Sequence, residues 1–215
     1  MYKTSETCQI ATLPQIYQDV FGDDHIGTFV EIGAYDGKTY SNTAGLAEMG
    51  WEGLYVEPVL EFYDLCVKNH KYDKNIKVIN ACAGSGNNAT LYIAGEYTTI
   101  SKEFISHVPA GWGITYSVGT PTPTIKLDRL LDKHWFFHRE TDLFVIDVEG
   151  AEMDVLNGLT LDYWRPKMVI IEACEQHPRE ERRVNAPLIN HYFRQAGYKK
   201  IYSDDCNNIY VRANV

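Results

Sequence analysis

Two glycines and one glutamate near the start of the chain are spaced as in a binding pocket for a nucleoside. The apolar run Phe29–Ile32 breaks into Gly33 and Gly37, and the next apolar run ends at Glu57. Glycine lacks a Cβ, so its backbone can adopt positive φ and approach a ligand closely. A carboxylate at the end of the following strand accepts hydrogen bonds from ribose hydroxyls. This combination predicts a pocket for a ligand with a free ribose.

The spacing of the glycines points away from a phosphate ligand. Gly-x-x-x-Gly matches neither the phosphate-binding P-loop nor the dinucleotide fingerprint Gly-x-Gly-x-x-Gly. S-adenosylmethionine has a ribose and no phosphate, and its amino-acid end would meet the backbone around Gly33. Glycines are also common in strand-to-helix turns, so the two glycines by themselves are equally well explained as residues that only form the turn.

Three carboxylates follow a second apolar strand. The segment Asp142–Glu152 runs through Leu-Phe-Val-Ile into Asp147, Glu149 and Glu152. Acids at the carboxyl end of a strand lie where open α/β sheets bind ligands. Their mutual repulsion is relieved if they bind a cation, take up protons or accept hydrogen bonds from a substrate. The alternative is that Glu149 and Glu152 only stabilise the positive amino end of the following helix.

Short apolar segments alternate with helical patterns, and this alternation predicts a mostly parallel sheet with helices on both faces. Two final apolar segments, Lys199–Ser203 and Asn208–Arg212, flank turn-forming residues and should pair as an antiparallel hairpin, giving seven strands. The other expected strands are residues 27–33, 52–57, 76–82, 143–148 and 167–173, and the expected helices are residues 41–49, 59–69, 151–158 and 185–196.

Four segments of the chain together resemble one protein family. They are Phe29–Gly37, Gly50–Pro58, Thr124–Asp128 and Ile146–Glu152. In this order they resemble the FkbM family of S-adenosylmethionine-dependent methyltransferases, over roughly residues 27 to 175. The resemblance implies a class I methyltransferase fold, a Rossmann-like α/β sheet that ends in an antiparallel hairpin, with S-adenosylmethionine as methyl donor. It also implies an oxygen acceptor on a sugar or another small polyhydroxylated molecule. Tyr35 departs from the small polar residue that the family often has there.

The expected cofactor site combines the glycine turn, the strand ends and small residues after the third strand. Ala81–Gly84 offers a wall that a flat adenine can approach, although close helix packing explains the same small residues. Asn42 would meet the cofactor carboxylate at the start of the first helix, whereas Ser41 is expected to cap that helix. The predicted cofactor-binding residues are Glu31, Gly33, Ala34, Tyr35, Gly37, Asn42, Glu57, Pro58, Cys82, Ala83 and Asp147.

Carboxylates are the expected catalytic groups, because an aliphatic hydroxyl is a poor nucleophile unless a base or a metal takes up its proton. Asp147 and Glu149 are the expected bases. Together with Glu172 they also offer the oxygen ligands that Mg²⁺ or Mn²⁺ prefers. His177, just beyond the strand that carries Glu172, is a third catalytic candidate, but a histidine in such a loop is more often an ordinary surface residue.

Residues 96–123 form a long connection rich in aromatic residues, glycine and proline. Such a connection inside a domain is usually a lid or a binding loop, and the ring faces of Trp112 and Tyr116 suit the C–H faces of sugars. Tethering of the loop to the core explains the same aromatics. The predicted substrate-binding residues are Tyr35, Trp112, Tyr116, Glu149, Glu152 and Glu172.

Length and composition predict one domain over residues 1–215. With 215 residues and 45% hydrophobic content, the chain can bury a large core without a second domain. Residues 1–22 contain a helical pattern and are expected to cap one side of the sheet or the mouth of the cofactor site.

Charge and hydropathy narrow the range of partners. The net charge of −9 argues against a nucleic-acid-binding protein, which needs a basic surface. Arg179, Arg182 and Arg183 are interpreted as a solvated helix start, with contact to an anionic acceptor such as a nucleoside-diphosphate sugar as the alternative. No stretch is apolar enough for a membrane span or a signal peptide. A cytoplasmic enzyme with a small-molecule or glycan acceptor is the resulting expectation.

Two other functions are compatible with parts of this pattern. A nicotinamide-dependent oxidoreductase uses a related sheet, but the Gly-x-x-x-Gly spacing and the terminal hairpin favour the methyltransferase. A binding module that has kept the fold and lost catalysis is the second alternative. The intact run of Asp147, Glu149 and Glu152 argues against it.

Overall fold

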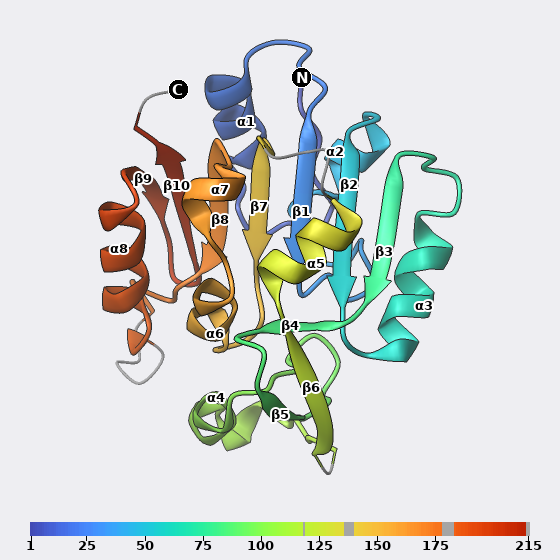
Figure 1. The fold of residues 1–215 in the computed structure, drawn as a ribbon, viewed down its shortest axis with the longest axis vertical. Coiled ribbons are helices and arrows are strands. Elements are labelled where there is room, and N and C mark those ends of the chain that lie inside the picture. The colour runs from blue at the N-terminus through green and yellow to red at the C-terminus, as the bar shows by residue number, and fades with distance from the viewer. Residues whose placement is uncertain (118, 136–139, 178–182, 214–215) are drawn as a thin grey trace.

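The protein is built on a seven-stranded sheet in the order β3-β2-β1-β7-β8-β10-β9 (Figure 1). A computed structural model describes residues 1–117, 119–135, 140–177 and 183–213. The five strands from β3 to β8 are parallel, and β10 runs antiparallel to both of its neighbours, β8 and β9. The predicted sheet with its antiparallel hairpin is therefore confirmed. The strands are β1 (Thr28–Ile32), β2 (Glu52–Glu57), β3 (Ile76–Asn80), β7 (Leu143–Ile146), β8 (Met168–Glu172), β9 (Tyr198–Ser203) and β10 (Asn207–Arg212).

Helices cover both faces of the sheet because its strands are apolar on both sides. Successive side chains of a strand point to opposite faces, so Val30 enters one core and Phe29 the other. The core of Val30 also contains residues of α5 (Leu127–His134), α6 (Glu152–Asn157), α7 (Leu161–Trp164) and α8 (Ala186–Gln195). The core of Phe29 contains residues of α1 (Leu13–Phe21), α2 (Ala44–Glu48) and α3 (Leu60–Asn69).

The strand expected over residues 76–82 is wrong in its last two residues, because the chain changes sheets after residue 80. β3 ends at Asn80, whose side-chain amide donates to the carbonyl oxygens of Glu57 and Pro58 at 2.9 and 3.0 Å. β4 (Cys82–Gly84) then joins a second, three-stranded sheet, in which β6 (Thr120–Lys126) lies between β4 and β5 (Asn88–Leu91).

The first predicted helix begins later than expected. α2 starts at Ala44 rather than near residue 41. The Ser41 hydroxyl accepts hydrogen bonds from the backbone N–H groups of Thr43 and Ala44, at 3.1 and 3.0 Å. Ser41 therefore satisfies two backbone donors at the start of the helix, but the N-cap position itself is occupied by Thr43 and not by Ser41.

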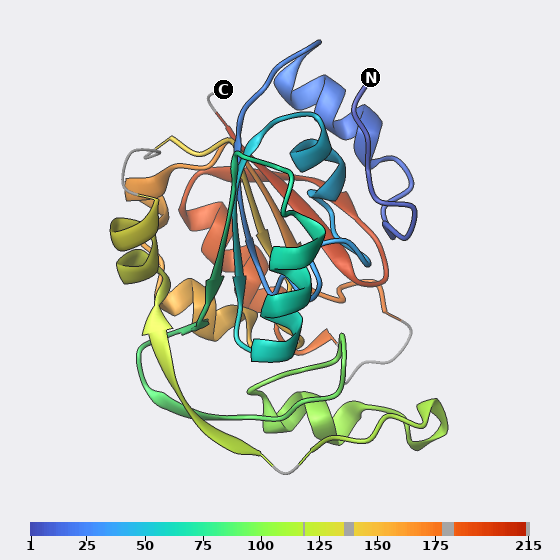
Figure 2. The same ribbon diagram turned by 90° about the vertical axis from the view of Figure 1, so that its right-hand side faces the viewer.

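The long connection over residues 96–123 contains ordered secondary structure. It includes α4 (Lys102–His107), a 3-10 turn at Ala110–Trp112 and the first part of β6. The Ser101 hydroxyl caps α4 by accepting from the N–H of Phe104 at 3.1 Å. In Figures 1 and 2 this segment lies beyond the carboxyl ends of the parallel strands, the edge at which α/β sheets bind ligands.

Asp142 ties the opposite, amino ends of β1 and β7 together. Its carboxylate accepts hydrogen bonds from the Thr28 N–H at 2.9 Å and from the Lys167 ammonium at 2.6 Å, and it lies 3.2 Å from Nε2 of His25. Burial raises the pKa of Asp142, but Lys167, Thr28 and His25 outweigh it and hold that pKa below its ordinary value.

Replacing Asp142 by alanine is expected to lower the free energy of unfolding by about 3 kcal/mol, because it removes a buried, charge-assisted cluster. Since the folded-state pKa is depressed, this stabilisation is present at neutral pH and is lost as the pH falls through the folded-state pKa. Urea unfolding measures the change. The exposed Asp132 on α5 provides the control, because Asp132→Ala should alter stability by less than about 0.5 kcal/mol. Equal losses in the two variants would contradict the role given to Asp142.

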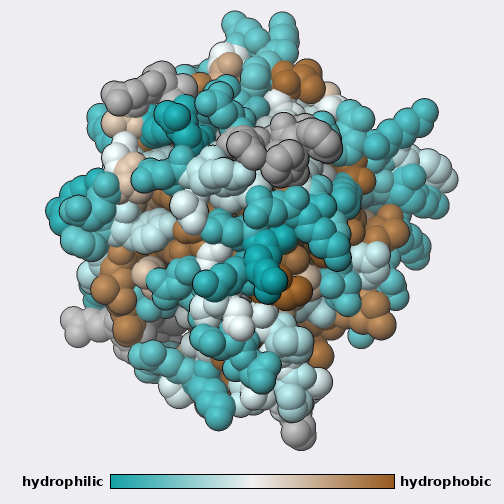
Figure 3. All heavy atoms as spheres, viewed as in Figure 1, coloured by the Kyte–Doolittle hydropathy of each residue, from teal (hydrophilic) through white to brown (hydrophobic). Residues whose placement is uncertain are grey.

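The surface seen in Figure 3 is mostly hydrophilic, with apolar residues scattered over it. Within the part of the chain that the structure describes, no helix has the length and apolar character needed to cross a membrane.

Candidate functional site

A pocket opens at the carboxyl ends of β1, β2 and β7. We call it the β2 pocket; it holds about 560 Å³ of empty space, counted out to the solvent at its mouth. Its polar groups come from the strand ends and from the connection that contains Glu96 and Thr99, and the larger part of its wall is apolar. The lining includes Ile32, Gly33, Tyr35, Val56, Glu57, Pro58, Phe62, Cys82, Ala83, Leu91, Glu96, Thr99, Ile100, Asp147 and Glu149.

Glu57 is the buried acid of the β2 pocket, with 4% of its surface exposed. One carboxylate oxygen accepts from the Tyr35 N–H at 2.9 Å and the other from the Val59 N–H at 2.8 Å. Burial raises the pKa of Glu57 to about 7, although these two hydrogen bonds oppose the shift. Because a carboxylate oxygen can accept more than one hydrogen bond, the group can also accept two ligand hydroxyls.

The two glycines of the sequence motif have different surroundings. Gly33 has φ +84°, and a Cβ there would clash with the carbonyl oxygen of Asp147. It lines the β2 pocket, so only glycine brings the backbone to this position. Gly37 has φ +72° and does not line the β2 pocket or the pocket beside it. Its close neighbours are the Cys66 thiol and the His70 ring, 2.6 and 2.8 Å from a Cβ placed there.

A second pocket, which we call the β1 pocket, adjoins the first. It holds about 680 Å³ and shares Gly33, Tyr35, Glu96, Asp147 and Glu149 with the β2 pocket. Its further lining includes Gln9, Glu31, Ala34, Thr39, Tyr40, Ser41, Asn42 and Tyr97. An elongated ligand that passes Gly33 can therefore occupy both pockets.

Glu31 is the buried acid of the β1 pocket. The Ser41 hydroxyl donates to it at 3.0 Å, and the Thr43 hydroxyl also donates to it. Burial raises the pKa of Glu31 to about 7, against these hydrogen bonds and with a contribution from the charge of Asp147. The chain thus holds an acid at the end of β1 that is easily protonated near neutral pH.

Replacing Glu31 by glutamine is expected to stabilise the protein at alkaline pH and to change little in acid. The folded-state pKa is raised from 4.5 to about 7, so stability is lost as the pH rises through this range. Ionisation above it costs on the order of 3 kcal/mol, which the neutral glutamine avoids. Thermal unfolding across this pH range measures the effect, with Glu48→Gln on the exposed side of α2 as the control. A constant difference at all pH values would be inconsistent with this shift.

Three carboxylates meet where β7 and β8 end. Oxygens of Asp147, Glu149 and Glu172 all lie within 4.8 Å of one another. Asp147 and Glu149 line both pockets described so far, and Glu172 is buried on their far side. The structure therefore brings together the three residues that the sequence predicted as oxygen ligands or bases.

Three residues that follow central strands have left-handed backbone conformations. Tyr35 follows β1 with φ +50°, Glu149 follows β7 with φ +53°, and Cys174 follows β8 with φ +45°. Such conformations are costly for residues with a Cβ and cluster at functional sites. For Glu149 the surrounding structure enforces it, because its carbonyl oxygen accepts from the Thr99 hydroxyl at 2.7 Å.

Glu152 holds the loop that carries Glu149 through hydrogen bonds to its backbone. It is 2% exposed, and one oxygen accepts from the N–H of Gly150 at 2.9 Å and of Val148 at 3.3 Å. Burial raises the pKa of Glu152 to about 7. These contacts place Glu152 among the groups that hold the loop carrying Glu149, while its side chain also lines a third pocket.

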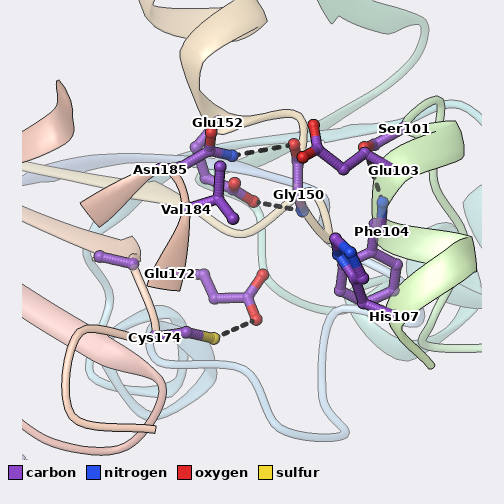
Figure 4. Close-up of a pocket in the computed structure, with 11 residues that line it drawn as sticks. Ser101, Glu103, Phe104, His107, Gly150, Glu152, Glu172, Cys174, Val184 and Asn185 are labelled. Carbon is purple, nitrogen blue, oxygen red and sulfur yellow. Dashed lines mark hydrogen bonds between the residues drawn. The ribbon is translucent and has the colours of Figure 1, made fainter. Parts of the chain in front are cut away.

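This third pocket, which we call the α4 pocket, lies between α4 and the ends of β7 and β8 (Figure 4). It holds about 450 Å³. Figure 4 shows the Glu172 carboxylate on one side of it and the Phe104 and His107 rings on the other. The lining is Ser101, Glu103, Phe104, His107, Gly150, Glu152, Glu172, Ala173, Cys174, Val184 and Asn185.

The remaining predicted residues lie at the edge of this arrangement. His177 is half-buried, its N–H donates to the Cys174 carbonyl at 3.1 Å, and it lines none of the three pockets. Trp112 is 47% exposed and packs on Tyr97 of the β1 pocket, with ring centroids 5.9 Å apart. Tyr116 is half-buried. Of the predicted cluster of Arg179, Arg182 and Arg183, the first two lie outside the described residues, and Arg183 is half-buried.

Several lining residues were not predicted from the sequence. Phe62 and Leu91 form walls of the β2 pocket, and Thr99 supports Glu149. Glu103 and His107 line the α4 pocket. All five lie outside the four family-like motifs. Thr99, Glu103 and His107 belong to the aromatic-rich connection over residues 96–123, which was the one sequence feature that could have indicated them.

Comparison with known proteins identifies the family of this chain. The Methyltransferase FkbM domain matches residues 31–200, most of the chain. No curated protein matches the sequence. Among solved structures, the O-methyltransferase from Bacillus cereus in complex with SAH has a TM-score of 0.54 at 14% identity, covering 98% of this chain and 83% of that chain. The METTL16 MTase domain has a TM-score of 0.51 at 14% identity, covering 100% of this chain and 74% of that chain.

At these identities the two structures establish the fold alone, which is the class I methyltransferase fold. The family match carries the assignment further, because it spans the glycine turn, Glu57 and the three carboxylates at the ends of β7 and β8. The chain therefore belongs to the FkbM family of S-adenosylmethionine-dependent methyltransferases.

Proposed function

We propose that the protein transfers a methyl group from S-adenosylmethionine to a hydroxyl of a saccharide or another small polyhydroxylated molecule. The observation that carries this proposal is the position of Glu57, a buried carboxylate at the end of β2 in a pocket with apolar walls. Such a group pairs with a ribose, and the apolar walls suit an adenine ring. The residues present therefore fit the cofactor that the family uses.

Each part of the cofactor has a matching set of residues. Glu57 would hold the ribose hydroxyls, and Cys82, Ala83 and Phe62 would flank the adenine. The amino-acid end would extend past Gly33 into the β1 pocket, where Glu31 and Asn42 offer polar groups. The remaining residues proposed for this site are Ala34, Tyr35, Pro58 and Asp147, with Gly37 supporting the turn.

When bound, S-adenosylmethionine supplies an electrophilic methyl carbon whose bond to sulfur breaks as the acceptor oxygen attacks. The chain must then orient the acceptor hydroxyl and take up its proton. Glu149 is best placed for this, because it lines the β1 and β2 pockets and lies close to Glu172, which lines the α4 pocket. Asp147 is the alternative base. His177, the third predicted catalytic residue, lines none of the three pockets.

The decisive experiment is incubation with S-adenosylmethionine carrying a labelled methyl group and a panel of sugars and polyols. A labelled product with an O-methyl group supports the proposal. Label on nitrogen or carbon would contradict the O-methyl assignment. A parallel titration with NADH tests the oxidoreductase alternative, since saturable NADH binding without SAH binding would favour it.

A divalent cation, Mg²⁺ or Mn²⁺, is a further proposal for Asp147, Glu149 and Glu172. Three carboxylate oxygens within 4.8 Å of one another match the hard oxygen ligands that these ions prefer. If the ion orients the acceptor, EDTA treatment is expected to lower methyl transfer at least about tenfold and added Mg²⁺ to restore it. Full activity after EDTA treatment would reject the ion and leave the carboxylates as bases.

A further inference from the structure

The α4 pocket shares one loop of the chain with the β1 and β2 pockets. The loop of residues 147–151 contributes to the lining of all three, with Gly150 facing the α4 pocket and Glu149 facing the other two. Glu172 lines the α4 pocket, and one of its oxygens lies within 4.8 Å of oxygens of Asp147 and Glu149. A molecule in the α4 pocket would therefore reach the carboxylates that also border the cofactor pockets.

The walls of the α4 pocket combine negative charge with one apolar surface. Glu103, Glu152 and Glu172 contribute carboxylates. Among the described lining residues His107 is the one basic side chain, and no lysine or arginine is present. Figure 4 shows the Glu172 carboxylate directed into the space, opposite the Phe104 ring. Phe104 is a buried side chain, and its position against Gly150 fixes it there, because a Cβ on Gly150 would lie 2.8 Å from Phe104.

Burial makes the ionised forms of the Glu152 and Glu172 carboxylates unfavourable. Glu172 is 7% exposed and Glu152 is 2% exposed. Glu152, whose pKa burial raises to about 7, accepts from the N–H groups of Gly150 and Val148. Glu172 accepts from the Cys174 thiol at 3.2 Å. None of these donors carries a positive charge. A ligand ammonium would offset the negative charge, since a charge in a water-poor site is stabilised by an opposite charge with good hydrogen bonds. A phosphate in the same place would be repelled.

The geometry points to the α4 pocket as the acceptor site, and to an amine-bearing hydroxylated ring such as an amino sugar as its ligand. This inference rests on the proposed methyl transfer, because it assigns the second substrate of that reaction. The ammonium group lies beside Glu103 and Glu152, which leaves Glu172 to the proposed cation, and the C–H face of the ring packs on Phe104. A ring hydroxyl then reaches past Glu172 toward Glu149, since oxygens of these two residues lie within 4.8 Å of one another. Glu149 takes up the hydroxyl proton as the oxygen–methyl bond forms and the methyl–sulfur bond breaks.

The test compares three matched sugars on the protein saturated with SAH. Glucosamine, glucose and glucose 6-phosphate differ in charge on a common ring, and calorimetry measures their binding at about pH 7. We expect glucosamine to bind about tenfold more tightly than glucose, and glucose 6-phosphate to bind more weakly than glucose. In Glu103→Gln, which alters an exposed residue and leaves the core intact, the preference for glucosamine should fall to about threefold or less.

Glu61→Gln is the matched control, because Glu61 is an exposed glutamate of α3 outside all three pocket linings. The preference for glucosamine should be unchanged in it. Equal binding of glucosamine and glucose, tightest binding of glucose 6-phosphate, or no binding of any of the three with SAH bound would overturn the assignment of the acceptor. Failure of the folded protein to bind SAH would instead overturn the proposed function.

Discussion

Glu57→Ala is expected to weaken SAH binding by at least about 100-fold, the largest effect on cofactor affinity that a single side chain should have. The substitution removes both carboxylate oxygens that are proposed to accept hydrogen bonds from the ribose hydroxyls. It also releases the N–H groups of Tyr35 and Val59, which the carboxylate holds at 2.9 and 2.8 Å. The turn after β1 and the start of α3 then lose their common anchor, so the pocket is less well organised before the ligand arrives.

The measurement is isothermal titration with SAH, because it needs no acceptor. Glu52→Ala is the control on the same strand, since Glu52 is exposed at the opposite end of β2 and should leave affinity unchanged. Circular dichroism establishes that Glu57→Ala is folded, because two buried N–H groups are left without their acceptor in it. Wild-type affinity in a folded Glu57→Ala protein would remove the proposed ribose site.

The sheet was predictable because its strands are marked by local sequence. β2 coincides with the predicted residues 52–57, where an apolar run ends at Glu57 and Pro58 follows. The terminal hairpin was marked by turn-forming residues between two apolar runs. These features depend on neighbours in sequence, and the apolar strands on both sides of the sheet leave little freedom in register.

The second sheet was not predictable, because the sequence of its central strand, β6, contains residues that usually argue against a strand. β6 contains Pro121 and Pro123, and proline within a run argues against a strand. In the structure, both prolines lie in the part of β6 that pairs only with β5, and β4 pairs with the later residues 124–126. Missing N–H groups are tolerated there because that part of β6 is an edge.

The site was predictable only as far as its motifs reach. Glu57 and Asp147 follow apolar strands, so parallel strand ends bring them to one edge of the sheet. The α4 pocket depends instead on α4, which comes from a long connection without a periodic pattern and meets Glu172 from far along the chain. The position of α4 depends on tertiary contacts such as the hydrogen bond from the Thr99 hydroxyl to the Glu149 carbonyl. Such contacts join residues far apart in sequence, so no local sequence pattern predicts them.

Glu149→Gln is expected to lower kcat for methyl transfer by about 10²–10⁴-fold while changing the SAH dissociation constant by less than about threefold. Glutamine has the shape of glutamate but cannot take up the acceptor proton. The position of Glu149 supports a role in turnover. Its backbone is held at φ +53°, and its side chain lies between the cofactor pockets and Glu172.

The comparison of kcat with SAH affinity separates this role from a structural one. Replacement of a residue that only shaped the loop would weaken cofactor binding and turnover together. Loss of turnover alone identifies a group that acts on the acceptor. Glu61→Gln on α3 should preserve both quantities. If Glu149→Gln kept its full kcat, proton transfer would fall to Asp147, whose oxygen lies within the same 4.8 Å cluster.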